Sequence, residues 1–267
     1  MNHLSETWIV EGVVGADTAV AEMTILLDTL PKELSSYLCQ HHQEDLINMN
    51  EISLQIGLLP KLILTDPQTG VITHHFLGGN PCGEAHIALF KEIFHNTNDS
   101  TSTKRKGIPK TLHRMSVITR PDTGKVLGVT VRVGRSLTGL VQAMTPGPSF
   151  LVDMARRGKS LLLVGKPGVG KTTVLRDMAR RLSSPELNLV VVVVDKTCET
   201  AGDGDAPHAC IGQARWMPVV VAGLQPQIMV EAVENQVPDV MIVDEISSPQ
   251  EVRAAHTIAQ RLSLIHI

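Results

Sequence analysis

A glycine-rich segment between residues 165 and 173 has the residue types that can hold a phosphate group. Gly165 is followed, after four positions, by Gly170, Lys171 and Thr172, which is the spacing G-x-x-x-x-G-K-[ST]. Glycines let backbone N–H groups approach an anion, the lysine supplies a charge for the β- and γ-phosphates, and the threonine hydroxyl can bind Mg²⁺. We predict nucleotide binding by this loop. The predicted binding residues are Gly165, Lys166, Pro167, Gly168, Val169, Gly170, Lys171, Thr172 and Thr173.

The segments that flank the glycines are those that a phosphate-binding loop requires. Four apolar residues, Leu161 to Val164, predict a strand that leads into the loop. Residues from Lys171 to Leu182 predict an amphipathic helix whose positive N-terminal end points at the same anion. The alternative, a glycine-rich turn with a solvated lysine, does not explain this context.

A second nucleotide-binding motif is VMIVDEI, from Val240 to Ile246, whose four apolar residues predict a buried strand with two carboxylates at its carboxyl end. Asp244 fits the carboxylate that holds Mg²⁺, directly or through water, and Glu245 can polarise a water that attacks the γ-phosphate. Such a run is a weak signal alone. It becomes strong about 70 residues after a phosphate loop, because both motifs need parallel strands that end at one edge of a sheet.

A third apolar run, Leu189 to Val194, predicts a strand buried on both faces of a parallel sheet. Asp195, Thr197 and Glu199 follow it, at the edge where ligands bind in such sheets. The loop AGDGDA at residues 201–206 lacks the twelve-position ligand pattern of a calcium loop. Amphipathic or apolar spacing further predicts a short strand over Met217–Val221 and helices over Gln225–Gln236 and Pro249–Arg261.

The composition of the 267 residues narrows the class of protein. Hydrophobic residues make up 43% of the chain, which is enough for a buried core. A net charge of −3 and 3% aromatic residues do not favour a nucleic-acid surface, so such a partner is possible but unsupported by charge. Four widely spaced cysteines indicate reduced thiols. We expect no membrane span and no targeting segment, and a cytoplasmic or plastid-stromal location.

We predict four regions along the chain. Residues 1–95 form a small α+β region, with helical spacing from Thr24 to Cys39 that Pro31 interrupts and strands over Leu58–Leu64 and Val71–Phe76. Its paired histidines lack metal-ligand spacing and are expected to be solvated. Residues 96–110 read as a linker or long loop. Residues 111–148 form a β-rich connecting segment, with strands over Met115–Thr119 and Val126–Val133, and residues 149–267 form the nucleotide-binding core.

The run from Thr111 to Arg261 resembles the stage III sporulation protein AA-like P-loop ATPases, which include a conserved reading frame of chloroplast and cyanobacterial genomes. The matching segments are TLHRMSVI, GVTVRVGR, GKSLLLVGKPGVGKTTVLRDMAR, VVVVDKTCETAGDGDAPHACIGQARWM, MVEAVENQVPDVMIVDEI and AAHTIAQR. The resemblance implies an α/β fold with a RecA-like core, similar to that of secretion and pilus motor ATPases.

The same resemblance implies ATP hydrolysis with Mg²⁺ and a homo-oligomer, a hexameric ring. By analogy, Glu199 falls in the acidic element after the second strand, which adds it to Lys171 and Glu245 as a predicted catalytic residue. The analogy also makes Arg132, Arg135 and Arg215 candidates for an arginine that acts across a subunit boundary. One departure from the family pattern is Cys198-Glu199-Thr200, where family members usually have Asn-Glu-Ile.

In this core type, the strand that follows the Asp-Glu strand lies between it and the phosphate-loop strand. Residues Leu262 to Ile267 can fill that position. We expect instead that the chain is truncated and that these residues are foreign to the natural sequence. Two alternatives to an active ATPase stay open: a nucleotide-dependent, nucleic-acid-associated scaffold or switch whose hydrolysis is incidental, and an inactive fragment.

Overall fold

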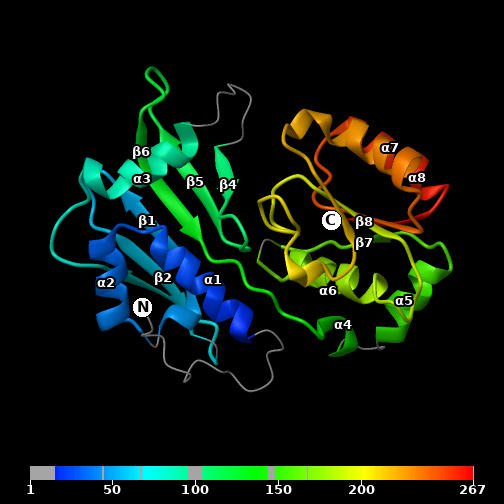
Figure 1. Cartoon of the computed structure of the whole chain (residues 1–267), viewed down its shortest axis with the longest axis horizontal. Helices are drawn as coiled ribbons and strands as arrows, with labels where there is room; N and C mark the ends of the chain where they lie inside the picture. Colours follow the sequence, from blue (N-terminus) through cyan, green and yellow to red (C-terminus); the bar gives the residue numbers. More distant parts are fainter. Residues whose placement is uncertain are drawn as a thin grey trace. The chain divides into compact units, whose positions relative to one another are not determined.

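The computed structural model describes residues 16–43, 45–66, 68–95, 104–143, 148–166 and 168–266 (Figure 1). The described chain divides into two compact units, the first up to Arg135 and the second from Ser136 onward. Both units combine helices and strands, so the predicted α/β class is confirmed. None of the helices within the described ranges has the length and apolar character needed to cross a membrane.

The first unit is built on a six-stranded antiparallel sheet in the order β3-β2-β1-β6-β5-β4. Its strands are β1 (Met49–Gln55), β2 (Lys61–Thr65), β3 (Ile72–Phe76), β4 (Arg105–Gly107), β5 (Arg114–Thr119) and β6 (Val126–Arg132). Four of them were predicted to within a few residues. The central strand β1 was not predicted. Strand β4 lies in the segment that we expected to be a linker, where it pairs with β5 instead.

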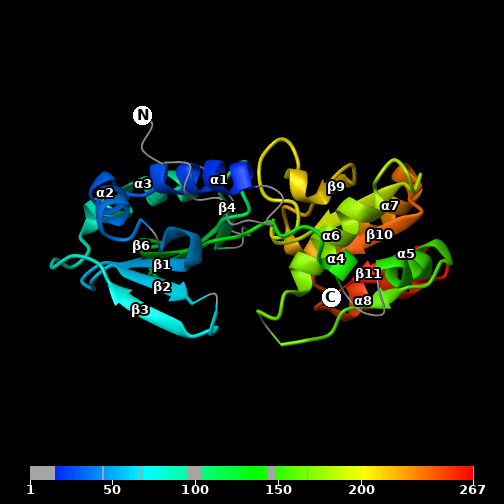
Figure 2. The same ribbon diagram turned by 90° about the horizontal axis from the view of Figure 1, so that it is seen from below.

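Three helices cover one face of this sheet (Figure 2). They are α1 (Ala16–Asp28), α2 (Lys32–His41) and α3 (Glu84–His95), and a short 3₁₀ turn, η2 (Leu46–Asn48), leads into β1. Pro31 separates α1 from α2, as predicted, because proline interrupts a helix. Alternate strand residues such as Ile52 and Leu54 pack against Leu26, Leu38 and Phe90 in one core.

The second unit is built on a five-stranded parallel sheet in the order β7-β11-β10-β8-β9. Its strands are β7 (Leu161–Leu162), β8 (Val191–Asp195), β9 (Arg215–Pro218), β10 (Val240–Val243) and β11 (Ser263–His266). Every residue of β8 and β10 is buried, as the continuous apolar runs predicted. Strand β11 occupies the position between β7 and β10, so residues 263–266 fill the slot that the family resemblance gives to the strand after the Asp-Glu strand.

Helices lie on both sides of this sheet (Figure 1). On one side, α7 (Gln225–Gln236) and α8 (Pro249–Ala259) pack on β8 and β10, where Met229 and Ile258 meet Val192 and Met241. On the other side lie α5 (Pro148–Arg156) and α6 (Lys171–Leu182), preceded by the short helix α4 (Leu140–Ala143). The turns η3 (Ala209–Ile211) and η4 (Ala222–Leu224) complete the unit. Helices α6 and α7 have the predicted bounds.

Candidate nucleotide-binding site

The predicted phosphate loop joins β7 to the N-terminus of α6. Strand β7 ends at Leu162, two residues earlier than predicted, and α6 begins at Lys171. Gly168 and Gly170 have φ angles of 80° and 92°, in the left-handed region that side chains disfavour. Glycine is therefore the residue type suited to both positions, and the loop ends where a twelve-residue helix begins, whose N-terminus can bind an anion.

The lysine of the loop folds back over it. Lys171 Nζ donates hydrogen bonds to the carbonyl oxygens of Gly165 at 3.0 Å and Lys166 at 3.1 Å. The ammonium group is thus held at the centre of the loop by two neutral acceptors. An anion that enters the loop would compete with these carbonyls for the same charge, and charge-assisted hydrogen bonds are the stronger kind.

Two buried ionic side chains anchor α6 to its surroundings. The carboxylate of Asp177, 1% exposed, accepts the backbone N–H groups of Gly139 at 3.1 Å and Val141 at 2.7 Å. The guanidinium of Arg176, 7% exposed, donates from Nε to the carbonyl of Glu199 at 3.0 Å and also from Nη2. The helix that begins at the loop is therefore fixed to the turn after β8.

The register of the sheet brings the phosphate loop and Asp244 to the same edge. Val243, His266 and Leu162 are paired across β10, β11 and β7. Asp244 follows that row directly, and the glycine loop leaves the same row from β7. Neighbouring strands of a sheet are about 4.8 Å apart, and β11 lies between β7 and β10. The ends of β7 and β10 are therefore roughly 10 Å apart across the sheet, a distance that a bound phosphate and cation can span.

Asp244 itself is buried, and its Oδ2 atom accepts a 2.6 Å hydrogen bond from the hydroxyl of Thr197. Asp195, at the end of β8, is fully buried and accepts the N–H of Ala201 at 2.8 Å. Burial, followed by the negative charge of Asp244, raises the pKa of Asp195 to about 7. A proton on Asp195 therefore relieves the repulsion between two neighbouring buried carboxyl groups.

Glu245 lies beyond the end of β10 with an exposed side chain and a φ angle of 50°. The side-chain amide of Gln225, which is fully buried, donates to the carbonyls of Asp244 at 3.3 Å and Glu245 at 3.0 Å. The first residue of α7 thus holds the backbone of both acidic residues. Strand β10 ends at Val243, so it consists of the four apolar residues that were predicted to place both carboxylates at its carboxyl end.

The remaining predicted site residues have different surroundings. The side chain of Glu199 is half-buried on the turn that Arg176 holds. The half-buried guanidinium of Arg135 donates to the carbonyls of Ile47 and Met49, so it connects η2 and β1 within the first unit. Arg132 pairs with Glu51 at 3.2 Å and Arg215 donates to Gln236, and both side chains are exposed.

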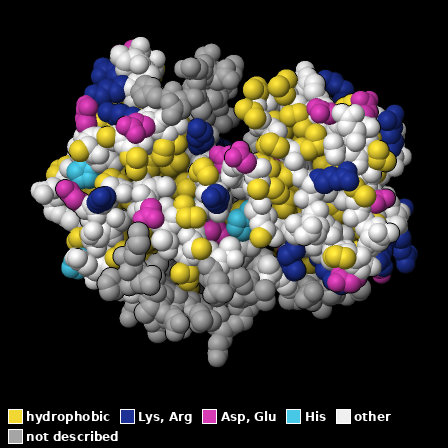
Figure 3. Space-filling view, in the orientation of Figure 1, with side chains coloured by type: hydrophobic (Ala, Val, Ile, Leu, Met, Phe, Trp, Pro, Cys, Tyr) yellow, Lys and Arg dark blue, Asp and Glu magenta, His cyan; other side chains and the backbone are white. Residues whose placement is uncertain are grey.

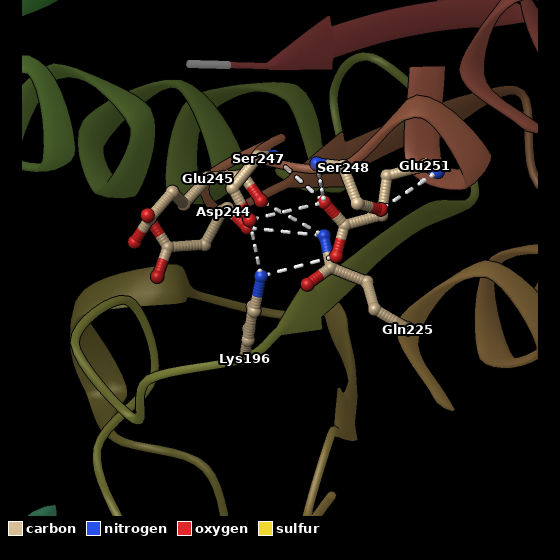
Figure 4. A network of polar contacts seen from close by, with 7 residues as sticks. All are labelled: Lys196, Gln225, Asp244, Glu245, Ser247, Ser248 and Glu251. Atoms are coloured by element: carbon tan, nitrogen blue, oxygen red, sulfur yellow. Dashed lines mark hydrogen bonds and ion pairs between the residues drawn. The ribbon is translucent and has the colours of Figure 1, made fainter. Parts of the chain in front are cut away.

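Three side chains near Asp244 and Glu245 were not singled out in the sequence: Lys196, Gln225 and Glu251 (Figure 4). Lys196 and Glu251 form an ion pair at 3.0 Å. The spacing Ser248-x-x-Glu251 before an apolar helix is a capping box, and the structure contains both of its hydrogen bonds. That spacing was the one available signal for Glu251, whereas no local pattern marks its partner Lys196.

A family model for the ATPase family associated with various cellular activities (AAA) matches residues 161–263. The protein ycf45 of Porphyra purpurea is 50% identical over 239 residues, covering 88% of this chain and 38% of that protein. Protein SEEDLING PLASTID DEVELOPMENT 1 of Arabidopsis thaliana is 45% identical over 245 residues, covering 90% of this chain and 32% of that protein. The chain thus spans about a third to two fifths of the length of these relatives.

Stage III sporulation protein AA of Bacillus subtilis (strain 168) is 24% identical over 246 residues, covering 87% of this chain and 76% of that protein. Among solved structures, the pilus retraction motor PilT with bound ADP matches with a TM-score of 0.57 at 15% identity, covering 86% of this chain and 66% of that chain. The ATPase DotB of Legionella pneumophila matches with a TM-score of 0.55 at 12% identity, covering 86% and 63%. These structures share the fold, which agrees with the predicted RecA-like core. The similarity to the ycf45 proteins, to SEEDLING PLASTID DEVELOPMENT 1 and to stage III sporulation protein AA fits the predicted family of stage III sporulation protein AA-like P-loop ATPases.

Proposed function

We propose that this chain binds ATP and hydrolyses it with Mg²⁺. The observation that carries the proposal is the parallel register of β7, β11 and β10, which brings the glycine loop and the Asp244-Glu245 pair to one sheet edge. The match of residues 161–263 to the AAA family model supports the same activity. A plain anion site would need the loop but not the acidic pair.

In this proposal the phosphates are bound by backbone N–H groups of the loop and by the N-terminus of α6. Lys171 exchanges its two carbonyl acceptors for the β- and γ-phosphate oxygens. Gly165 and Gly168 keep the loop free of side chains where the phosphates approach, and Thr173, the third residue of α6, contributes its N–H group. In this proposal, nucleotide binding changes the hydrogen-bond partners of Lys171 and keeps the backbone conformation of the loop.

The donor set fits a Mg²⁺ ion. Mg²⁺ prefers oxygen ligands and is usually held by one or two protein groups together with phosphate oxygens and water. The hydroxyl of Thr172, in the first turn of α6, and the buried carboxylate of Asp244 are such groups on one edge of the sheet. The cation would neutralise charge that develops on the phosphate oxygens. Thr197 keeps the Asp244 carboxylate in a fixed rotamer for that purpose.

Glu245 is the proposed general base. Its exposed carboxylate follows Asp244 by one residue, and can accept a proton from a water molecule that attacks the γ-phosphate. Glu199 lies on the turn held by Arg176 and is proposed to assist at the same edge. Arg132 and Arg215 are the better candidates for action on a neighbouring subunit of a ring, because their side chains are exposed, whereas backbone carbonyls hold the half-buried Arg135.

Two broader features belong to the same proposal. The family resemblance favours a ring-forming motor, and the name of the Arabidopsis relative refers to plastid development, which favours a plastid location for this chain as well. Lys and Arg side chains on the face shown in Figure 3 are interspersed with acidic and neutral ones rather than gathered in one basic patch. Together with the net charge of −3, this arrangement favours the motor over a nucleic-acid scaffold.

The experiment compares two site variants with two surface controls. Lys171→Ala should weaken binding of a fluorescent ATP analogue at least about tenfold, because it removes the charge that faces the phosphates. Glu245→Gln should bind the analogue normally but hydrolyse ATP about a hundredfold more slowly, since general-base catalysis contributes about 10²–10⁴-fold. Lys32→Ala and Glu234→Gln, at exposed positions, should match the wild type. Undiminished turnover by both site variants would disprove the proposed function.

A further inference from the structure

The loop that carries Asp244 and Glu245 is held by side chains from three other elements (Figure 4). It runs from the end of β10 to Ser248, the N-cap of α8. Gln225 of α7 holds its first half through the backbone carbonyls of the two acidic residues. Its second half is held by Lys196, which follows β8, and by Glu251, in the first turn of α8.

Lys196 and Glu251 form a nearly dry ion pair. Nζ lies 3.0 Å from Oε1, and the side chains are 12% and 2% exposed, respectively. Such a pair gains little stability over an apolar pair, but removal of one partner leaves an uncompensated buried charge. The cost of this arrangement suggests a purpose other than bulk stability.

Both members of the pair reach the loop. Glu251 Oε2 accepts the backbone N–H groups of Ser247 at 2.7 Å and Ser248 at 2.8 Å. Lys196 Nζ donates to the hydroxyl of Ser247 at 2.8 Å, and that hydroxyl also lies 3.2 Å from Glu251 Oε2. Two consecutive backbone N–H groups, directly after Glu245 and Ile246, are therefore fixed by one carboxylate that is itself fixed by one ammonium.

Glu251 keeps its charge despite its burial. Burial alone would raise the pKa of this carboxyl group, but the N–H of Ser247, the ammonium of Lys196 and the N–H of Ser248 outweigh it and lower the pKa below its ordinary value. The anchor thus remains a full carboxylate at neutral pH.

The conformation of Glu245 explains why the loop needs an anchor on both sides. Its φ angle of 50° lies in the left-handed region, which costs a non-glycine residue about 1 kcal/mol or more and persists only where the surroundings impose it. Lys196 also stands between Asp195 and Thr197, and Thr197 holds the carboxylate of Asp244. The short segment 195–197 therefore contacts both halves of the loop between β10 and α8: Thr197 contacts Asp244, and Lys196 contacts Ser247.

We propose that Lys196 and Glu251 are positioning residues for ATP hydrolysis: together they hold Glu245 and Asp244 in the productive arrangement through the backbone of Ser247 and Ser248. The inference rests on the proposed function and adds two residues to it, neither of which touches the nucleotide. It requires that breaking the pair lowers the rate of turnover and leaves nucleotide binding intact.

The test is a double-mutant cycle on the full chain, with Lys196→Met, Glu251→Gln and the double variant. Each single variant should lower kcat roughly tenfold with KM within about twofold, because only the geometry of the transition state is lost. The double variant should lose no more than the worse single variant, since coupled residues are not additive. Lys196→Arg, which keeps the charge, should retain kcat within about threefold.

A matched surface pair provides the control. Arg181 and Glu186 lie 3.8 Å apart in the same unit with 37% and 72% exposure, so Arg181→Met and Glu186→Gln should leave kcat unchanged. All rates are expressed per nucleotide-binding chain, counted by titration. If this normalisation removes the loss in kcat, the pair only stabilises the fold and the inference is wrong. If Glu251→Gln does not fold, the kcat values of Lys196→Met and Lys196→Arg decide whether the pair has a positioning role.

A second readout separates this inference from the proposed function. Hydrogen exchange of the Ser247 and Ser248 amides should be faster in Lys196→Met and Glu251→Gln than in the wild type and the two controls. If the wild type hydrolyses ATP and the variants keep its kcat, the positioning role is overturned while the ATPase proposal stands. If the wild type hydrolyses no ATP, the ATPase proposal fails. In that case faster exchange still supports the role of the pair in holding the loop, and unchanged exchange overturns it.

Discussion

The hydroxyl of Thr197 donates to the Oδ2 atom of Asp244 across 2.6 Å, and so links the turn after β8 to the end of β10. The two residues are 47 positions apart in the chain, and β8 and β10 are neighbouring parallel strands. A parallel sheet aligns the carboxyl ends of its strands, so a polar residue two positions past one strand can reach the first residue past the next. This bond fixes the rotamer of the carboxylate that we propose as a Mg²⁺ ligand.

Thr197→Val, which keeps the shape of the side chain and removes the hydroxyl, should weaken the apparent affinity for Mg²⁺. A lost hydrogen bond to a charged group costs about 1.5–3 kcal/mol, so we expect a roughly tenfold or larger rise in the Mg²⁺ concentration for half-maximal ATPase rate. The measurement is a Mg²⁺ titration at saturating ATP, with Thr257→Val on the exposed side of α8 as the control. Unchanged Mg²⁺ dependence would remove Thr197 from the site.

Asp195→Asn should change the pH dependence of stability. The pKa of Asp195 rises from 3.8 to about 7 on folding, because burial and then Asp244 disfavour its charge. The folded state therefore holds this proton more tightly, and the resulting stability is complete below about pH 4 and lost as the pH rises through 7. Asparagine has no proton to lose. The free energy of unfolding of the variant, relative to the wild type, should rise by roughly 2–3 kcal/mol between pH 5 and pH 8.

Urea unfolding at several pH values, without Mg²⁺ or nucleotide, measures that difference. The variant also loses one acceptor for the backbone N–H groups that Asp195 holds, but this loss is the same at every pH. A difference that stays constant from pH 5 to pH 8 would mean that Asp195 is ionised throughout in the folded chain.

Arg135→Ala should destabilise the first unit, whereas Arg132→Ala should not. Arg135 donates to the backbone carbonyls of Ile47 and Met49, and its loss leaves buried acceptors unsatisfied, at a cost of about 2–4 kcal/mol. The exposed pair of Arg132 with Glu51 contributes about 1 kcal/mol or less. Thermal and urea unfolding compare the two variants. Equal stability of the two would contradict the assignment of Arg135 as a structural residue.

ATP should protect Lys171 from acylation by an amine-reactive reagent. In the nucleotide-free chain its Nζ atom donates to two loop carbonyls, and both belong to exposed residues. Binding of a triphosphate would cover the ammonium group and lower its reactivity. Peptide mass spectrometry with and without ATP gives the ratio, with the exposed Lys32 of α2 as the internal standard. Equal labelling of Lys171 in both samples would place the phosphates elsewhere.

The parts of the fold that were predictable from the sequence are those with local signals. Helices α6 and α7 have the predicted bounds, because apolar periodicity and a glycine or proline near the start act within one turn. Strands β8 and β10 were recognisable as unbroken apolar runs. The shared edge of the two motifs followed from the parallel strands that both need, and the slot between β7 and β10 followed from the family resemblance.

The features that the sequence did not predict depend on partners that are distant in the chain. Strand β1 has polar residues such as Asn50 and Ser53 on its second face, and it is a strand because β2 and β6 flank it. Strand β4 has three residues, two of them charged, and exists only by pairing with β5. Lys196 and Glu251 are 55 positions apart, so their ion pair is a property of the folded sheet and not of either sequence neighbourhood.

Strand β11 sets the spacing of the proposed reaction centre. The glycine loop and the acidic pair leave strands that are not neighbours in the sheet, and these four residues fill the interval between them. They are reached from Glu245 through α8, whose first turn contains Glu251 and whose last residue lies four positions before β11. A displacement of α8 would thus move the acidic border of the interval together with the strand that fills it.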